Sequence, residues 1–502
     1  MKLTKIFAAV AVALSLFAPE AAARDLVILQ TNDTHSQIDP TDKGFGGVQR
    51  RKVFIDSVRG ASPDVLLIDS GDAVQGTLFF TLHGGKVEMD VMSLLGYDVQ
   101  ILGNHDFDNG VEAMARNVAR SKASWISTNY TFDNDSVAGL FLPWKVFRYG
   151  DRKVGVIGLN LNPEGMISPK CSEGVNYHDA VKVGNIAAAW LKDREDVDLV
   201  VAVTHLGYGD VVPPSDMDIA KNSKDIDIIL GGHSHTLITP GSGKEWLLNA
   251  DGDSVLVTQN GKSGQYISEV TVDLDSVGLK KPRLRQVLLD KSYDRSHSAA
   301  LDSVIEPYRA AVDALMNEKI GTSRQELPND KPALLNFVSD FCAARGTELA
   351  GRKLDLALMN SGSLRRGLPK GDITKGQIIS MQPFTNRILV MEISGKDLID
   401  AMNVYARRNG DGLSSSGHVK YNPATHQVTS FTIDGKPVDP AKTYLVATID
   451  YLASGGDYMV PLKNGRVIAT SSDIVYDDLI RYITNLRRPI SPSSSPRFLP
   501  TR

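Results

Sequence analysis

Residues 101–110 place an amide, an imidazole and two carboxylates within a few positions of one another. The apolar run that ends at Gly103 predicts a buried strand. We therefore expect Asn104 and His105 on the loop beyond its carboxyl end, where open α/β sheets bind their ligands. Gly103 and Gly110 permit the tight backbone that such crowding requires. This loop is a candidate site for chemistry.

Four other stretches follow the same rule, an apolar run of strand type and then Asp, Asn or His. They are residues 26–35, 65–72, 199–205 and 226–235. The candidate metal ligands at the five strand ends are Asp33, His35, Asp72, Asn104, His205, His233 and His235. Nitrogen and oxygen ligands without a thiolate suit Zn, Mn, Co or Fe, and this set exceeds the needs of one ion. We expect two divalent metal ions about 3.5–4 Å apart, bridged by Asp72, to activate water for phosphoryl transfer.

The five motifs together resemble those of the calcineurin-like metallophosphoesterases, and among these the 5′-nucleotidase branch with its Gly-Asn-His-x-Phe-Asp form. The resemblance implies that one metal is held by Asp33, His35, Asp72 and His235. It implies that the other is held by Asn104, His205 and His233. His235 stands where relatives often carry Gln or Asn, a departure that bears on metal preference. The resemblance also implies that His105 and Asp108 act as a catalytic dyad beside the metals.

The second half of the chain carries arginine and aromatic motifs instead. Residues 359–365, 382–386 and 451–457 resemble the C-terminal nucleotide-binding domain of 5′-nucleotidases, so the resemblance covers nearly the whole mature chain. It implies a substrate-binding set of Arg324, Arg365, Phe384, Tyr451 and Asp457. A base stacked between Phe384 and Tyr451 would gain about 1–3 kcal/mol. The planar fork of Arg365 suits phosphate oxygens, and Asp457 can accept hydrogen bonds from ribose hydroxyls or base nitrogens.

The elements that must position these residues indicate an α/β protein of more than one domain, because 502 residues exceed one ordinary domain. Helical patterns at 46–58, 110–122 and 179–194 alternate with apolar runs, among them 153–158, which predicts a layered core. The resemblance implies a four-layer α/β/β/α sandwich followed by an α/β domain. The expected organisation is a signal peptide (1–23), a metallophosphoesterase domain (24–294), a connector helix (295–320) interrupted at Pro307, a substrate-binding domain (321–488) and a disordered tail (489–502).

The basic start, the apolar run to Ala18 and the small residues at 21–23 predict a cleaved secretory signal peptide. We therefore expect a periplasmic or secreted protein without a membrane anchor. A net charge of −4 argues against nucleic acid polymers and anionic membranes as partners and favours a small-molecule nucleotide. The two cysteines, Cys171 and Cys342, are interpreted as structural, with their pairing and the oligomeric state left open.

These observations predict an exported two-metal phosphohydrolase that releases phosphate from nucleoside 5′-monophosphates, and also from di- or triphosphates or cyclic nucleotides. Alternatives are a UDP-sugar or dinucleotide pyrophosphatase and a 2′,3′-cyclic-nucleotide phosphodiesterase. Sulfur-ester hydrolysis is disfavoured by the aromatic residues. A nucleotide-binding protein with an inactive metal site is disfavoured because all seven ligand positions carry competent side chains.

Overall fold

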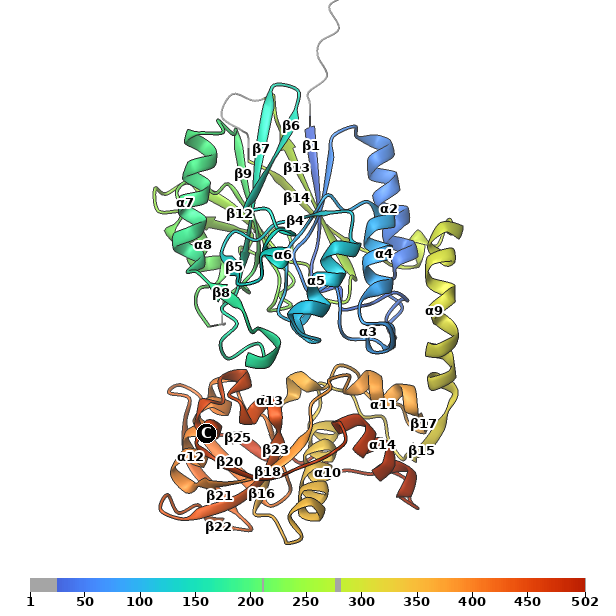
Figure 1. The fold of residues 1–502 in the computed structure, drawn as a ribbon, viewed down its shortest axis with the longest axis vertical. Coiled ribbons are helices and arrows are strands. Elements are labelled where there is room, and N and C mark those ends of the chain that lie inside the picture. The colour runs from blue at the N-terminus through green and yellow to red at the C-terminus, as the bar shows by residue number, and fades with distance from the viewer. Residues whose placement is uncertain (1–24, 210–211, 276–280, 502) are drawn as a thin grey trace, which may run out of the picture.

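The computed structural model describes residues 25–209, 212–275 and 281–501, so the expected signal peptide lies outside the described residues. Two bodies follow one another along the chain, with helix α9 running beside both (Figure 1). No helix in the described ranges is both long enough and apolar enough to cross a bilayer.

The first sheet of the N-terminal domain has the order β14-β13-β1-β2-β3-β4. Its strands are β1 (Asp25–Thr31), β2 (Val65–Asp69), β3 (Val99–Gln100), β4 (Ser124–Trp125), β13 (Tyr266–Asp273) and β14 (Arg283–Leu288). Strands β1 to β4 are parallel. Their carboxyl ends therefore share one edge of the sheet.

The second sheet has the order β11-β12-β10-β9-β7-β6. Its strands are β6 (Trp144–Tyr149), β7 (Arg152–Asn160), β9 (Leu199–His205), β10 (Ile228–Leu230), β11 (Trp246–Leu248) and β12 (Ser254–Thr258). Strands β7, β9, β10 and β12 are parallel. A small pair, β5 (Tyr130–Phe132) and β8 (Val175–Tyr177), lies outside both sheets.

Alternation along β1 explains how the layers form. Leu26 and Ile28 belong to the core between the two sheets, whereas Val27 and Leu29 pack under the helices of the first sheet. Those helices are α2 (Val48–Ala61), α3 (Leu78–His83), α4 (Lys86–Leu95), α5 (Val111–Arg120) and α6 (Asp135–Ala138). Helices α7 (Ala180–Asp193) and α8 (Asp216–Asn222) cover the second sheet. The expected four-layer sandwich is thus confirmed. The three helices predicted from periodicity correspond to α2, α5 and α7 with ends that differ by one to three residues, and the predicted strand lies within β7.

Helix α9 (Ala299–Asn317) packs against α3 and α4 of the N-terminal domain and against α11 of the C-terminal domain. Leu301 and Ile305 are buried against the N-terminal domain. Pro307 was expected to interrupt this helix, but the helix continues through it. Arg309 pairs with Asp39 through both carboxylate oxygens, at 2.8 and 2.9 Å, and so fixes α9 to the N-terminal domain.

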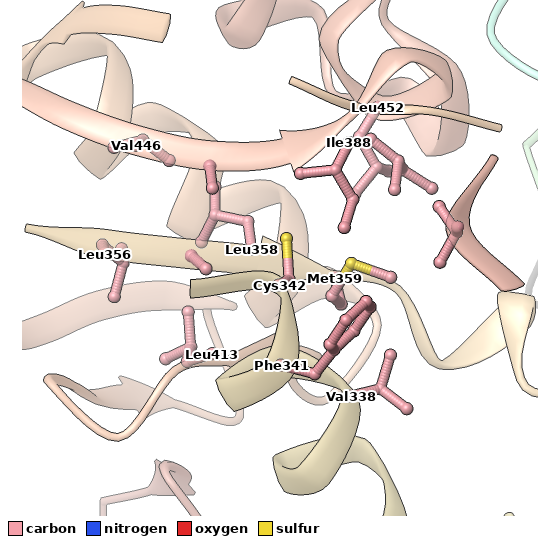
Figure 2. Packing of buried hydrophobic residues seen from close by; sticks show 14 of the residues in the cluster. Val338, Phe341, Cys342, Leu356, Leu358, Met359, Ile388, Leu413, Val446 and Leu452 are labelled. Atoms are coloured by element: carbon pink, nitrogen blue, oxygen red, sulfur yellow. The ribbon is translucent and has the colours of Figure 1, made fainter. Parts of the chain in front are cut away.

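The C-terminal domain is also α/β. One sheet has the order β19-β16-β23-β18-β24 and another β22-β21-β20-β25. The strands are β15 (Lys319–Ser323), β16 (Leu356–Met359), β17 (Gly371–Thr374), β18 (Ile388–Ser394), β19 (Gly412–Leu413), β20 (Gly417–Asn422), β21 (Gln427–Ile433), β22 (Lys436–Pro437), β23 (Thr443–Ile449), β24 (Arg466–Thr470) and β25 (Phe498–Pro500). The helices are α10 (Pro332–Ala350), α11 (Lys375–Met381), α12 (Gly395–Arg407), α13 (Asp450–Ala453) and α14 (Val475–Asn485). Phe341 and Cys342 of α10 pack in the same core as Leu358 of β16 and Val446 of β23 (Figure 2).

The tail expected to be disordered is folded onto the C-terminal domain. Phe498 pairs with Val419 as β25 joins β20, and Ile490 is buried. Arg497 binds both oxygens of Asp340, at 2.9 and 2.7 Å. The Pro/Ser-rich composition predicted disorder, but Ile490, Arg497 and Phe498 contact the domain and order the segment.

Candidate active site

The seven predicted ligands converge where the two sheets present their carboxyl ends. Asp33 and His35 follow β1, Asp72 follows β2, Asn104 follows β3, His205 ends β9, and His233 and His235 follow β10. Two groups of side chains bring their ligand atoms within 4.8 Å of one another: Asp33, His35 and His235, and Asp33, Asp72 and His205. Asn104 joins the cluster through its Oδ1, which lies 2.9 Å from Nδ1 of His233.

Asp72 lies between histidines that the resemblance assigns to different metals. Its Oδ2 is 3.3 Å from Nε2 of His205 and 4.0 Å from Nε2 of His35. Its Oδ1 accepts a hydrogen bond from the backbone N–H of His105 at 2.8 Å. The carboxylate therefore lies between the two sets of candidate ligands.

The backbone at this site is unusual. The residues with left-handed φ are Asp33 (48°), His35 (48°), Asp72 (55°), His233 (76°) and His235 (54°). Such conformations cost about 1–3 kcal/mol each and persist only where the surrounding structure enforces them. A Cβ at Gly71 would lie 2.9 Å from Nδ1 of His205, and a Cβ at Gly103 would collide with the Asp72 carboxylate. These glycines let the loops approach closely enough for the ligands to meet.

The side chains present fit divalent cations. His205 donates from Nδ1 to the carbonyl of Ser70 at 2.7 Å, which leaves Nε2 buried and without a hydrogen-bond partner. Nε2 of His35 faces Nε2 of His235 at 3.0 Å, and Nε2 of His235 lies 3.4 Å from Oδ1 of Asp33. Imidazole lone pairs and carboxylates that point at a common centre are what Zn, Mn, Co or Fe sites require.

The electrostatics of the cluster keep its carboxylates ionised despite burial. Burial alone raises the pKa of Asp33, but the hydrogen bond and charge of His235 together with the charge of His205 outweigh it and lower the pKa to about 2. Burial lowers the pKa of His233 to about 3, which leaves this imidazole neutral. Ionised Asp33 and neutral His233 are thus in the protonation states that bind metal. Burial lowers the pKa of His205, but the charge of Asp72 outweighs burial and raises it to about 10, so His205 must release a proton when a metal binds.

His105 and Asp108 form a pair beside the cluster. Nδ1 of His105 lies 3.1 and 3.2 Å from the two carboxylate oxygens of Asp108. Nη2 of Arg365 lies 2.5 Å from Nε2 of His105. Because a guanidinium can only donate, Nε2 accepts and Nδ1 carries the proton that is donated to Asp108. His105 thus faces Arg365 of the C-terminal domain, in keeping with a role as dyad rather than ligand.

Arg365 and the aromatic residues of the C-terminal domain face the metal-ligand cluster across one cleft. The guanidinium of Arg365 lies 5.2 Å from the ring centre of Phe384, and that ring lies 5.8 Å from the ring of His105. The cleft has a volume of about 1190 Å³, and the predicted residues that line it are Asp72, Asn104, His105, Asp108, His233, His235, Arg365, Phe384, Tyr451 and Asp457. Residues from opposite halves of the sequence therefore share one cavity.

Arg324 does not belong to this cavity. It is exposed, and its backbone N–H donates to the carbonyl of Ile490 at the tail. The prediction placed it by analogy with a second phosphate-binding arginine in a stretch where the local sequence matched poorly. Arg408, just past the end of α12, lines the cleft instead and pairs with Asp457 at 2.7 Å.

Sequence reasoning also missed Asn360 and Cys171, which line the cleft. Asn360 could have been found, because it belongs to the motif of residues 359–365 that ends at Arg365. Cys171 is free, and its Sγ lies 3.7 Å from the carbonyl oxygen of Asp108. Cys342 is free and buried in the C-terminal core, where its sulfur lies among hydrocarbon side chains (Figure 2). The two cysteines therefore do not pair. Cys342 fits the structural interpretation, and Cys171 packs against the core of the N-terminal domain while it also lines the cleft.

Comparisons with known proteins agree with this geometry. Residues 26–237 match the calcineurin-like phosphoesterase family, and residues 310–463 match the C-terminal domain of 5′-nucleotidases. The 5′-nucleotidase of Homo sapiens is 27% identical over 93% of this chain and 90% of its own length. The trifunctional nucleotide phosphoesterase protein YfkN of Bacillus subtilis is 25% identical over 96% of this chain, which spans only 36% of that longer protein. The crystal structure of a 5′-nucleotidase precursor from Thermus thermophilus superposes with a TM-score of 0.84, at 26% identity over 95% of this chain and 99% of that one.

Proposed function

Since the chain belongs to the family that joins a calcineurin-like phosphoesterase domain to a 5′-nucleotidase C-terminal domain, we propose that it releases phosphate from nucleoside 5′-monophosphates. Its similarity to 5′-nucleotidases supports its assignment as a metal-dependent phosphoester hydrolase. The observation that carries the finer proposal is the shared cleft, in which the Asp and His cluster faces Arg365, Phe384 and Tyr451.

The metal site is proposed to hold two divalent ions. Asp33, His35, Asp72 and His235 would bind one, and Asn104, Asp72, His205 and His233 the other. Bound there, such ions supply a nucleophilic water near neutral pH and neutralise charge on the phosphoryl oxygens. Asp72 can serve both ions because it lies within 4.0 Å of histidines from each set.

The dyad is proposed to act on the leaving oxygen. Asp108 holds Nδ1–H of His105 and stabilises the positive charge that the imidazole acquires when Nε2 is protonated. Protonated Nε2 then donates to the departing 5′ oxygen of the nucleoside. Arg365 is drawn from Nε2 to the phosphate oxygens when substrate is present, because a guanidinium binds an anion more strongly than a neutral imidazole.

The C-terminal domain is proposed to select the nucleoside. Phe384 and Tyr451 line the cleft and provide aromatic faces for a base, worth about 1–3 kcal/mol of stacking. The cleft exceeds the ~300–1,000 Å³ typical of small-molecule sites, which favours pyrophosphate-linked substrates such as UDP-sugars or dinucleotides as a second candidate class.

Release of inorganic phosphate is the experiment that tests the proposal. The purified protein, loaded with Mn, Co or Zn, should release phosphate from AMP and lose that activity to a chelator. Parallel assays with UDP-glucose, NAD and a 2′,3′-cyclic nucleotide rank the alternatives, and they are read by chromatography of the nucleotide products because these cleavages release no inorganic phosphate. Preference for any of these over AMP by kcat/KM would contradict the monophosphatase proposal.

Export is a further part of the proposal, and it rests on the sequence of residues 1–23 alone. N-terminal sequencing of the protein purified from its natural source should begin after residue 23. A mature protein that begins at Met1 would contradict cleavage.

A further inference from the structure

Lys262 lies on a loop that is fixed to two of the loops carrying candidate metal ligands. The backbone N–H of Ser263 donates to the carbonyl of Asp33 at 2.7 Å. The backbone N–H of Gly261 donates to the carbonyl of Thr236, which directly follows the last candidate ligand, at 3.0 Å. The backbone on both sides of Lys262 is therefore held against the Asp33 side of the metal-ligand cluster.

The conformation of this loop does not depend on the side chain of Lys262. The buried amide of Asn32 holds the loop through both of its ends. Its Nδ2 donates to the carbonyl of Gly261 at 3.0 Å, and its Oδ1 accepts from the backbone N–H of Asn260 at 2.8 Å. A substitution at position 262 therefore removes the charge and leaves the loop in place.

The ammonium of Lys262 is a cation without an anion of its own. The residue is exposed, and no acceptor in residues 25–209, 212–275 and 281–501 forms a hydrogen bond or an ion pair with the ammonium. Partial burial and the charge of Arg365 lower the pKa of Lys262, whereas the charge of Asp33 raises it. Lys262 therefore lies within electrostatic reach of Arg365 from the C-terminal domain and of Asp33 from the cluster.

Arg365 faces the same region from the other domain. Its Nη2 contacts Nε2 of His105 at 2.5 Å, and its Nε is buried without a hydrogen-bond partner among the described residues. Asp33 is a proposed metal ligand, so its charge is assigned to the metal site. Two cations then face each other from the two domains. A phosphate group with nearly two negative charges at neutral pH relieves their repulsion when it binds between them.

We propose that Lys262 binds phosphate oxygens of the substrate from the N-terminal domain, opposite Arg365 of the C-terminal domain. The inference rests on the proposed nucleotidase function. A second phosphate-binding cation was expected at Arg324, which lies outside the cavity, and Lys262 supplies that cation from the other domain. The planar fork of Arg365 binds two oxygens, whereas the ammonium acts as a point charge. The oxygens belong either to the phosphate that is cleaved or to the neighbouring phosphate of a nucleoside diphosphate.

The substitution Lys262→Met tests the proposal, with Lys244→Met as the matched control at another exposed lysine of the same domain. Calorimetry on metal-loaded proteins of equal metal content measures the dissociation constants of inorganic phosphate, adenosine and a methylene-bridged ADP analogue. Lys262→Met should weaken the binding of phosphate-bearing ligands about threefold to thirtyfold, because the lost contact is charge-assisted but partly screened by solvent. Adenosine should bind as it does to wild type. Lys262→Arg, which keeps the charge, should retain most of the affinity for phosphate.

The same measurements separate the two sources of phosphate oxygens. Weaker binding of both inorganic phosphate and the ADP analogue identifies the phosphate that is cleaved, whereas weaker binding of the analogue alone identifies the neighbouring phosphate. Unchanged affinity for both, or an equal loss for adenosine, would overturn the assignment of Lys262. Failure of wild type to release phosphate from AMP would instead contradict the proposed function, and the affinity for inorganic phosphate would still decide the role of Lys262.

Discussion

Replacing His105 with alanine should separate proton transfer from metal binding. His105 contacts Asp108 through Nδ1 and Arg365 through Nε2, so both of its ring nitrogens already have partners other than the candidate metal ligands. We expect the His105→Ala protein to keep its metal content and to lose turnover.

The structure sets the size of the effect. The imidazole and the Asp108 carboxylate are 17% and 23% exposed, so their 3.1 Å contact is shielded enough to orient the ring. A positioned general acid contributes about 10²–10⁴-fold to rate, equal to about 3–5 kcal/mol of transition-state stabilisation. kcat should fall by that factor with KM for AMP nearly unchanged. Asp108→Asn keeps the shape and removes the charge, so it should cause a smaller loss of the same kind.

The assay combines phosphate release with elemental analysis of the same preparation. His297→Ala is the matched control, because His297 pairs with Asp302 at 2.7 Å on the surface outside the cleft. It should leave both readouts unchanged. A metal-free His105→Ala protein would show that His105 is a ligand, and retained turnover would show that the leaving oxygen needs no acid.

Three other outcomes are expected. Elemental analysis should find two metals per wild-type chain and none in Asp72→Ala, because this carboxylate is proposed to bind both ions. One metal per wild-type chain under metal-replete conditions would count against the dinuclear centre. Phe384→Ala should raise KM for AMP about 5- to 150-fold, the equivalent of about 1–3 kcal/mol of stacking, and leave KM for glycerol phosphate unchanged. An equal rise of KM for both substrates would show that the ring stabilises the core instead. Burial raises the pKa of Glu88 from its ordinary 4.5 to about 7. The folded state therefore keeps a proton that the unfolded chain has lost, and the free energy of unfolding falls by about 3 kcal/mol as pH rises through that window. Glu88→Gln should flatten the dependence of Tm on pH and raise Tm at pH 8, and parallel curves for the two proteins in calorimetry would contradict this.

The convergence of the candidate metal ligands could be predicted because each of them follows an apolar run. His205 and Asp72 are placed by the carboxyl ends of β9 and β2, so the order of residues in the chain already indicated their position in space. The dyad is likewise local, since His105 and Asp108 are three residues apart and meet within one turn.

The substrate side could be predicted only in part, because its contacts join distant segments. Arg408 meets Asp457 across 49 positions of sequence, and nothing around the end of α12 indicates that meeting. Arg324 was placed by analogy in a divergent stretch, where no motif fixed its position. The prediction of a disordered tail was wrong for a related reason. Composition does not indicate which few side chains of a Pro/Ser-rich segment pack against the domain.

Five of the metal-facing residues sit on left-handed turns, which Asp, Asn and His adopt far more readily than other side chains. The backbone conformation of the loops and the coordination of divalent cations therefore favour the same residue types, Asp, Asn and His. Glu at position 33 or Cys at position 72, introduced to bind a different metal, would adopt the left-handed backbone less readily than Asp does. Such a substitution would therefore strain the loop whatever its effect on metal coordination. At these five positions, exchange among Asp, Asn and His is compatible with the turns, whereas other ligand types would require the turns to be rebuilt.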